Sequence, residues 1–290
     1  MWTGADPSTV PVHNPSQPEF RMPTPFDALI AAPPSGRSIA LVLDHASYGS
    51  QRLLRGDPVP WTDPVACAAY FVRAQSLLEP DVALVDLGEA VTQHLAGASS
   101  LVKAMSARPR VGFALKALLA DEDLAVKLHT LVRVLSQTCR QPLVLQIPTP
   151  LRWLAICQVA VANDDLSAID AERAEGAAVF VSDWLRRFGA LPIALLLLDA
   201  RNTNPILAAL PEEDLTCYPP LRNATAHYRW SLALRTEQSV TVAGSAGVGV
   251  VLPETFWTDG TPAGRGAFRM ATVPFDAQPE RVLARLRDLV

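Results

Sequence analysis

Short apolar runs of strand length alternate with longer amphipathic segments along most of this chain. The runs are almost wholly hydrophobic and carry no alternating polar residues, which is typical of parallel strands buried on both faces. A strand followed by a helix, repeated, indicates βαβ units and a parallel sheet. Five runs predict clear strands, at residues 38–44, 82–86, 110–116, 142–147 and 193–199.

The second half of the chain is less regular, and it predicts three weaker strands near 215–218, within 239–251 and at 268–273. Helices are expected at about 63–78, 89–106 and 168–188, after Asp121 or Asp123, and after Pro279. Eight strands and a terminal helix favour an α/β fold of the (β/α)8 TIM-type barrel class. A doubly wound open sheet is the alternative.

Eight prolines lie within residues 1–35. Proline disfavours helix interiors and central strands, so we expect an extended Pro-rich N-terminal arm that precedes a single barrel domain over 36–290. Trp2, Phe20 and Phe26 could anchor this arm on the barrel or on a second subunit, as in a homodimer. A partly disordered tail is the alternative interpretation.

Composition narrows the class of protein. Of the 290 residues, 49% are hydrophobic, and the net charge is −4, so a nucleic-acid partner is not expected. The longest apolar stretch, 190–198, is about half of a membrane span, and no signal peptide is recognised, so we expect a soluble cytoplasmic protein. The four cysteines form no metal-binding spacing, so no metal or other cofactor is expected.

In barrels, the reactive groups lie at the C-terminal ends of the strands. In this chain, polar residues follow the C-terminal ends of the predicted apolar strands, and these residues are the candidates for the site. They are Asp44, His45, Glu89, Lys116, Gln146, Asp199 and Arg201, to which His227 adds a second imidazole. Asp86 and Asn202 also follow apolar runs, and no role is predicted for them.

Asp44 and His45 are the sharpest candidates, because a histidine can act as a general acid or base near neutral pH. Lys116, one of three lysines, could form a Schiff base or bind an anion. The structural alternatives are a strand-ending aspartate beside a partly exposed histidine, and a surface lysine.

The remaining candidates are expected to bind substrate. Glu89, at a predicted helix start, could instead be an ordinary helix-dipole partner. Asp199 and Arg201 could instead form a plain salt bridge, and His227 could be a structural histidine. Gln146 ends the fourth clear strand.

Two segments carry a resemblance to known families. Leu143-Val-Leu-Gln-Ile-Pro-Thr-Pro150 and Gln278-Pro-Glu-Arg-Val-Leu-Ala-Arg-Leu286 resemble a strand–turn and the final helix of the barrel superfamily of uroporphyrinogen decarboxylase and cobalamin-independent methionine synthase. The decarboxylase Arg-Gln-Ala-Gly-Arg segment and the synthase zinc residues are missing, so the resemblance implies the fold and neither reaction.

A second resemblance concerns Leu43-Asp-His45 with its Gly/Ser loop, which is similar to the first strand of bacterial class I fructose-bisphosphate aldolases. That family needs a Schiff-base lysine on the sixth strand, and no lysine follows Lys127 here. The titratable groups at the predicted strand ends lead us to expect a lyase, a decarboxylase or carbon–carbon bond-cleaving enzyme that acts on a small carboxylated substrate by acid/base chemistry. A methyltransferase-like barrel and a non-catalytic binding or scaffold protein are the alternatives.

Overall fold

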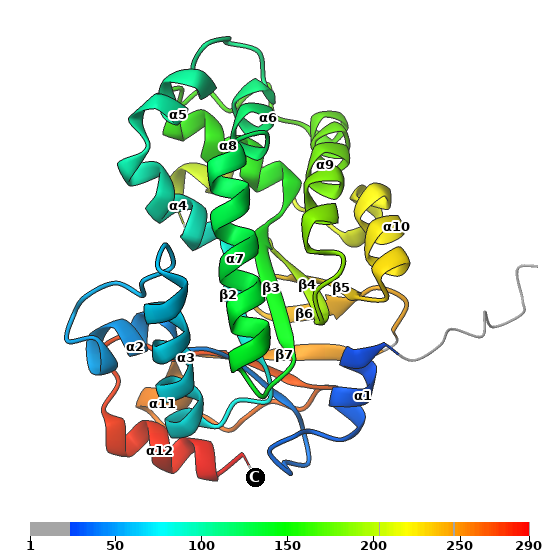
Figure 1. Ribbon diagram of the computed structural model, residues 1–290. Helices are drawn as coiled ribbons and strands as arrows, with labels where there is room; N and C mark the ends of the chain where they lie inside the picture. Colours follow the sequence, from blue (N-terminus) through cyan, green and yellow to red (C-terminus); the bar gives the residue numbers. More distant parts are fainter. Residues whose placement is uncertain (1–23, 203, 246, 290) are drawn as a thin grey trace, which may run out of the picture.

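A computed structural model describes residues 24–289 except 203 and 246, and it contains one eight-stranded sheet (Figure 1). The strand order is β1-β8-β7-β6-β5-β4-β3-β2. The strands are β1 (Leu41–Asp44), β2 (Ala83–Asp86), β3 (Leu143–Pro148), β4 (Ile193–Asp199), β5 (Ser231–Arg235), β6 (Ser239–Val242), β7 (Val248–Leu252) and β8 (Arg269–Thr272).

The sheet is nearly closed into a barrel. Its two edge strands, β1 and β2, meet through Asp81, whose backbone N–H donates to the Leu41 carbonyl at 3.0 Å and whose carboxylate accepts from the Leu41 N–H at 2.8 Å. Every neighbouring pair is parallel except those of β6, which runs antiparallel to both β5 and β7. The barrel-like α/β architecture is therefore confirmed, but β6 interrupts the parallel order.

Helices surround the sheet and also rise above one end of it (Figure 1). They are α1 (Pro25–Ala31), α2 (Ala46–Leu53), α3 (Pro64–Leu78), α4 (Leu87–Gly97), α5 (Ser99–Met105), α6 (Phe113–Leu119), α7 (Glu122–Thr138), α8 (Pro150–Ala160), α9 (Ala171–Leu185), α10 (Pro219–Tyr228), α11 (Thr255–Thr258) and α12 (Pro279–Arg287). Short 3-10 turns lie at Arg186–Phe188, Pro205–Ala209 and Leu215–Cys217. In Figure 1, α4, α5, α6 and α8 form an upper group, while α2, α3, α11 and α12 lie lower.

The barrel interior is apolar through most of its depth. Inward-facing side chains of the strands form one buried cluster, since alternate residues of a strand point to the same face. Its members include Val42, Leu84, Val144, Leu195, Leu197, Ala233, Val240, Val242 and Met270. A second, larger cluster packs the helices against the outside of the sheet.

Helix α1 closes the N-terminal end of the barrel. Thr24 and Asp27 form a capping box and Pro25 takes the first helical position, which starts the helix. Phe26 is fully buried and packs edge-on against Phe268 at a centroid distance of 5.3 Å. The expectation of an extended arm is thus wrong for Pro25–Ala31, while Trp2 and Phe20 lie outside the described residues.

Four of the five clear strands form as predicted, and the exception is the run at 110–116. Most of this run belongs to helix α6, which is part of the helical excursion α4–α6 between β2 and β3. The weak strand at 215–218 is a 3-10 turn, and 239–251 contains two strands, β6 and β7, which form a hairpin. Strand β5 (Ser231–Arg235) completes the sheet, and the sequence pattern did not predict it.

Phe26→Ala should destabilise the fold by about 3–5 kcal/mol, because it removes a buried aromatic ring and leaves a cavity under the barrel. Urea denaturation at pH 7 measures the free energy of unfolding. The matched control is Phe275→Ala, which truncates a ring that is 60% exposed and should change stability by less than about 0.5 kcal/mol. Equal effects of the two substitutions would contradict the burial of Phe26 at the closed N-terminal end of the barrel.

Candidate functional site

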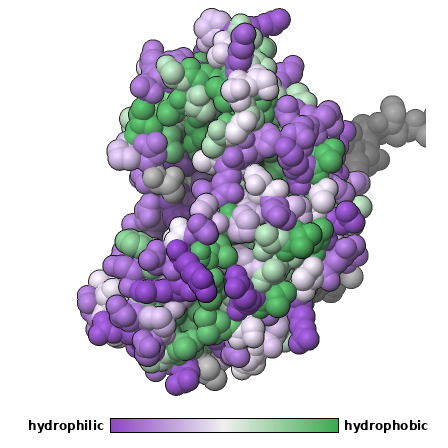
Figure 2. Space-filling view, turned by 60° about the vertical axis from the view of Figure 1, so that its left-hand side comes forward, coloured by the Kyte–Doolittle hydropathy of each residue, from purple (hydrophilic) through white to green (hydrophobic). Residues whose placement is uncertain are grey.

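A cleft of about 480 Å³ lies above the C-terminal ends of β1 to β4. It is bounded by α2 and the loop that follows it, by α4, and by α8. The space-filling view shows an indentation on this side of the molecule, beneath a hydrophobic cluster in the upper part (Figure 2). The cleft therefore occupies the position at which barrel enzymes place their chemistry.

The floor of the cleft is a polar layer set on top of the apolar barrel interior. The strand register places Asp44 beside Thr272, Asp86 beside Gln146, and Asp199 beside Arg235. Each follows an inward-facing apolar residue by two positions, for example Asp44 after Val42. The alternation of a strand therefore turns these polar side chains inward at the barrel mouth.

Arg235 lies at the centre of this layer and is 1% exposed. Its Nη1 donates to Gln146 Oε1 at 3.1 Å and to Asp44 Oδ2 at 3.4 Å, and its Nη2 donates to Thr272 Oγ1 at 2.7 Å. Burial and the neighbouring Arg201 lower the pKa of Arg235. The guanidinium thus connects β5 with β1, β3 and β8.

Arg235 also determines which way the Gln146 amide points. A guanidinium only donates hydrogen bonds, so the amide oxygen faces Arg235 and the amide nitrogen faces the other way. That nitrogen donates to Asp86 Oδ2 at 2.6 Å. A chain of fixed polarity therefore leads from Arg235 through Gln146 to Asp86.

Asp86 ends β2 and caps α4, because its Oδ1 accepts from the Glu89 N–H at 3.0 Å. Gly88 allows this turn to pass close to Pro148, since a Cβ there would lie 2.9 Å from the proline Cδ. Burial raises the pKa of Asp86 to about 7, helped by the Asp44 and Asp199 charges and opposed by its two hydrogen bonds. Asp86 can therefore exchange a proton near neutral pH.

Arg201 reaches the cleft from the loop after β4. Its Nη2 and Nε donate to the Asp199 carboxylate at 2.7 and 2.9 Å, and Nη2 lies 3.9 Å from Asp44 Oδ2. Burial opposes the charge of Arg201, but Asp199 and Asp44 hold its pKa above the usual value. The guanidinium is held along one edge by Asp199 and remains 19% exposed toward the cleft.

A second buried arginine, Arg152, lines the cleft from the first turn of α8. Its Nη1 donates to Asn202 Oδ1 at 3.0 Å, and its Nε lies 3.2 Å from Glu213 Oε1. Glu213 also accepts from Tyr218, and burial raises the pKa of its carboxyl. Arg152 is thus held from behind by a carboxylate, as Arg201 is.

The upper walls of the cleft are apolar. They come from the loop after α2, from α4, α6 and α8, and from the 3-10 turn after β4. The side chains are Val59, Trp61, Val91, Leu95, Leu118, Ile156 and Leu207. A charged floor under apolar walls suits a ligand with a polar end and an apolar body.

His45 lies outside the cleft lining, although Asp44 lies in it. Consecutive residues at a strand end face opposite sides, so Asp44 points into the barrel and His45 into the surrounding helices. The His45 Nδ1 lies 2.7 Å from the Tyr70 hydroxyl, and Nε2 is buried with no hydrogen-bond partner among the described residues. Burial lowers the pKa of His45 to about 4, so the ring is neutral at pH 7.

Lys116 and His227 are placed away from the cleft. Lys116 is exposed on α6, with its Nζ 5.3 Å from the centre of the Phe180 ring. The prediction that it ends a strand is wrong, because the local apolar run is one face of a helix. His227 is exposed near the end of α10, which leads into the N-terminal end of β5, opposite the mouth.

Asp44, Glu89, Gln146, Asp199 and Arg201 are brought together along the cleft. Sequence reasoning missed Arg235, Thr272, Arg152 and Glu213. Arg235 carried the same signal as Asp44, because Leu232-Ala-Leu-Arg235 is an apolar run that ends in a charge. Arg152 and Glu213 carried no local signal, since loop packing joins them across the fold.

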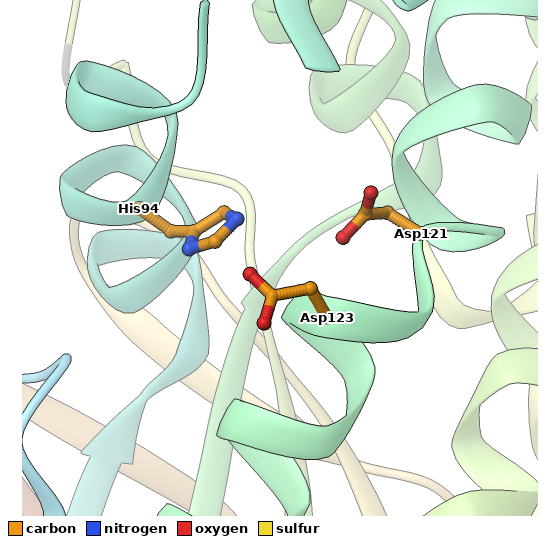
Figure 3. A group of neighbouring side chains, drawn as sticks. All are labelled: His94, Asp121 and Asp123. Carbon is orange, nitrogen blue, oxygen red and sulfur yellow. The ribbon is translucent and has the colours of Figure 1, made fainter. Parts of the chain in front are cut away.

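His94, Asp121 and Asp123 form a separate group between α4 and the start of α7, with side chains turned toward one another (Figure 3). One ligand atom from each lies within 4.8 Å of the others. Asp121 caps α7 through the Leu124 N–H, and Asp123 pairs with Lys127 at 2.6 Å. Both carboxylates therefore already have partners within their own helix, and Asp123 is exposed.

No family model, curated protein or solved structure matches this chain. Across the described residues, no helix combines the length and the apolar character needed to cross a bilayer.

His45→Asn should make stability less dependent on acid pH. The pKa of His45 is about 4 in the folded chain against about 6.5 unfolded, so folding disfavours its protonation and stability falls as pH drops from about 6.5 toward 4. Between pH 7 and 4.5, protonation of this group alone should lower the free energy of unfolding of the wild type by about 2–3 kcal/mol. Urea unfolding at both pH values measures this free energy. An identical loss in the variant would refute a buried neutral histidine.

Proposed function

We propose that this chain is a lyase of the (β/α)8-barrel class that cleaves a carbon–carbon bond, by decarboxylation or release of a carbonyl fragment, in a small carboxylated substrate. The supporting observation is Asp86, a carboxyl with a pKa of about 7 that lines a cleft above the strand ends. A group with this pKa can be protonated before the reaction and can give up its proton during it.

Asp86 acts as the general acid. When the carbon–carbon bond breaks, its electron pair remains on the substrate carbon, and the neighbouring carbonyl of the substrate delocalises the charge. In decarboxylation the other fragment leaves as CO2. In release of a carbonyl fragment, the hydroxyl of that fragment becomes the carbonyl and its proton passes to solvent. Asp86 then donates its proton to that carbon and becomes a carboxylate, which solvent reprotonates. Gln146 keeps its N–H on Asp86 Oδ2 and stabilises the carboxylate that forms, because Arg235 holds the amide in that orientation.

Arg201 is proposed to bind the substrate carboxylate. Asp199 holds one edge of its guanidinium, so the side chain is already oriented and loses little entropy when it binds. Lys116, His45 and His227 have no part in this proposal, because the fold places them outside the cleft. The resemblance to the uroporphyrinogen decarboxylase and methionine synthase superfamily supports the barrel class only.

Asp86→Asn should reduce turnover by at least about a hundredfold, because it removes the proton donor and keeps the shape of the cap. Screening 2-oxo, 3-oxo and hydroxy acids by proton NMR and by CO2 release identifies the substrate for the measurement. The wild-type rate should fall as pH rises through about 7, because Asp86 must be protonated to act.

The control is Asp164→Asn, which removes an exposed carboxyl in the loop after α8. It should leave both the rate and the pH profile unchanged. A wild-type rate that stays flat between pH 6 and 8, or an Asp86→Asn variant that retains full activity, would contradict the proposed role.

A further inference from the structure

Asp44 lines the cleft but has no close hydrogen-bond donor among the described residues. The Ala46 N–H, Arg235 Nη1 and Thr272 Oγ1 all lie 3.4 Å from its carboxylate oxygens, and Arg201 Nη2 lies at 3.9 Å. Charge-assisted hydrogen bonds of a carboxylate are normally about 2.7–2.9 Å long. This carboxylate is 17% exposed and can therefore accept a closer donor from a ligand in the cleft.

Unlike Asp44, the two arginines that line the cleft among the described residues are held by close partners. Arg201 is held at 2.7 Å by Asp199, and Arg152, only 6% exposed, is held by Asn202 and Glu213. The Arg152 Nε is buried and faces Glu213, so it is closed to a ligand. Arg201 is fixed from behind by Asp199, is 19% exposed, and offers its remaining N–H groups to a carboxylate.

The charges around the cleft favour a ligand that also carries a positive group. Four carboxyls and two guanidiniums line the cleft, and Glu213 and Arg235 stand directly behind them. The carboxyls outnumber the guanidiniums even when Asp86 is protonated. A purely anionic ligand would increase this imbalance, whereas an ammonium group would reduce it.

The distance between the two binding positions limits the ligand further. Arg201 Nη2 and Asp44 Oδ2 are 3.9 Å apart, so a carboxylate at Arg201 and an ammonium at Asp44 can come from neighbouring positions of one ligand. An amine and a carboxylate attached to the same carbon satisfy this condition. The apolar walls from Trp61, Leu118 and Ile156 then receive the rest of the molecule.

We propose that the cleft binds an α-amino acid with an apolar side chain, its ammonium on Asp44 and its carboxylate on Arg201. This inference rests on the proposed function for the carboxylate position and adds the amine and the apolar body. Cleavage by the proposed route additionally requires a carbonyl within that body, next to the bond that breaks, so the experiment below tests binding and not turnover. It names Asp44 as a specificity-determining residue for the amine.

Calorimetric titration of the full chain with three compounds of one skeleton tests the proposal. These are phenylalanine, 3-phenylpropanoate, which lacks the amine, and 2-phenylethylamine, which lacks the carboxylate. Phenylalanine should bind at least about tenfold more tightly than either of the others, as expected when a charged hydrogen bond is lost. Serine, which has no apolar body, should bind more weakly than phenylalanine.

Variants separate the two charged contacts. Asp44→Asn should weaken phenylalanine at least about tenfold and leave 3-phenylpropanoate within about twofold, and Arg201→Gln should weaken both. Asp164→Asn is the matched control and should change neither affinity. Asp44 also belongs to the polar layer at the floor of the cleft, so its substitution can affect folding. The melting temperature of each variant is therefore measured as a control. The comparison of the three compounds on the wild type needs no variant.

The outcomes distinguish this inference from the proposed function. If 3-phenylpropanoate binds as tightly as phenylalanine, and Arg201→Gln weakens it, the amine site is refuted and carboxylate binding stands. If 2-phenylethylamine binds as tightly as phenylalanine, carboxylate recognition fails and the proposed function fails with it. If none of the three compounds binds, the amino-acid inference is refuted, and the Asp86→Asn experiment decides the proposed function.

Discussion

The buried guanidinium of Arg235 is the interaction on which the barrel mouth depends. A charge that is 1% exposed is stable only when its hydrogen-bond donors are paired, and loss of a partner leaves an uncompensated buried charge. The partners come from β1 and β8, which are neighbours at one edge of the sheet, and from β3, which lies next to the other edge strand. One side chain therefore links the two ends of the sheet, beside the Asp81–Leu41 hydrogen bonds that join the edges.

The same interaction influences the pKa of Asp86. Arg235 orients Gln146, and Gln146 in turn donates to Asp86, which lies directly above the apolar interior of the barrel. Burial and the two neighbouring aspartates favour the protonated form, and the hydrogen bonds favour the ionised one. A pKa near 7 results from these opposing effects, so the pKa of Asp86 depends on the whole polar layer.

Much of the barrel and part of the site could be predicted from sequence. Strands that are buried on both faces, such as Ile193–Asp199, can be recognised from sequence because no polar residue interrupts their apolar run. The run 110–116 was misassigned because a short apolar stretch fits one face of a helix equally well, and only the α4–α6 excursion decides between them. Residues such as Arg152 and Glu213 meet through loop packing, which periodicity cannot reveal.

The pKa values of His45 and Asp86 show why residue type alone can mislead about chemistry. Histidine ordinarily titrates near neutrality and aspartate far below it, so sequence favours His45 as the acid/base group. Burial acts in opposite directions on the two, because it penalises the charged form of each: it lowers the pKa of His45 and raises that of Asp86. Since strand alternation turns Asp44 toward the cleft, it must turn His45 into the helices. The environment therefore takes the near-neutral pKa away from the His45 imidazole and gives it to Asp86, a carboxyl on the other edge strand.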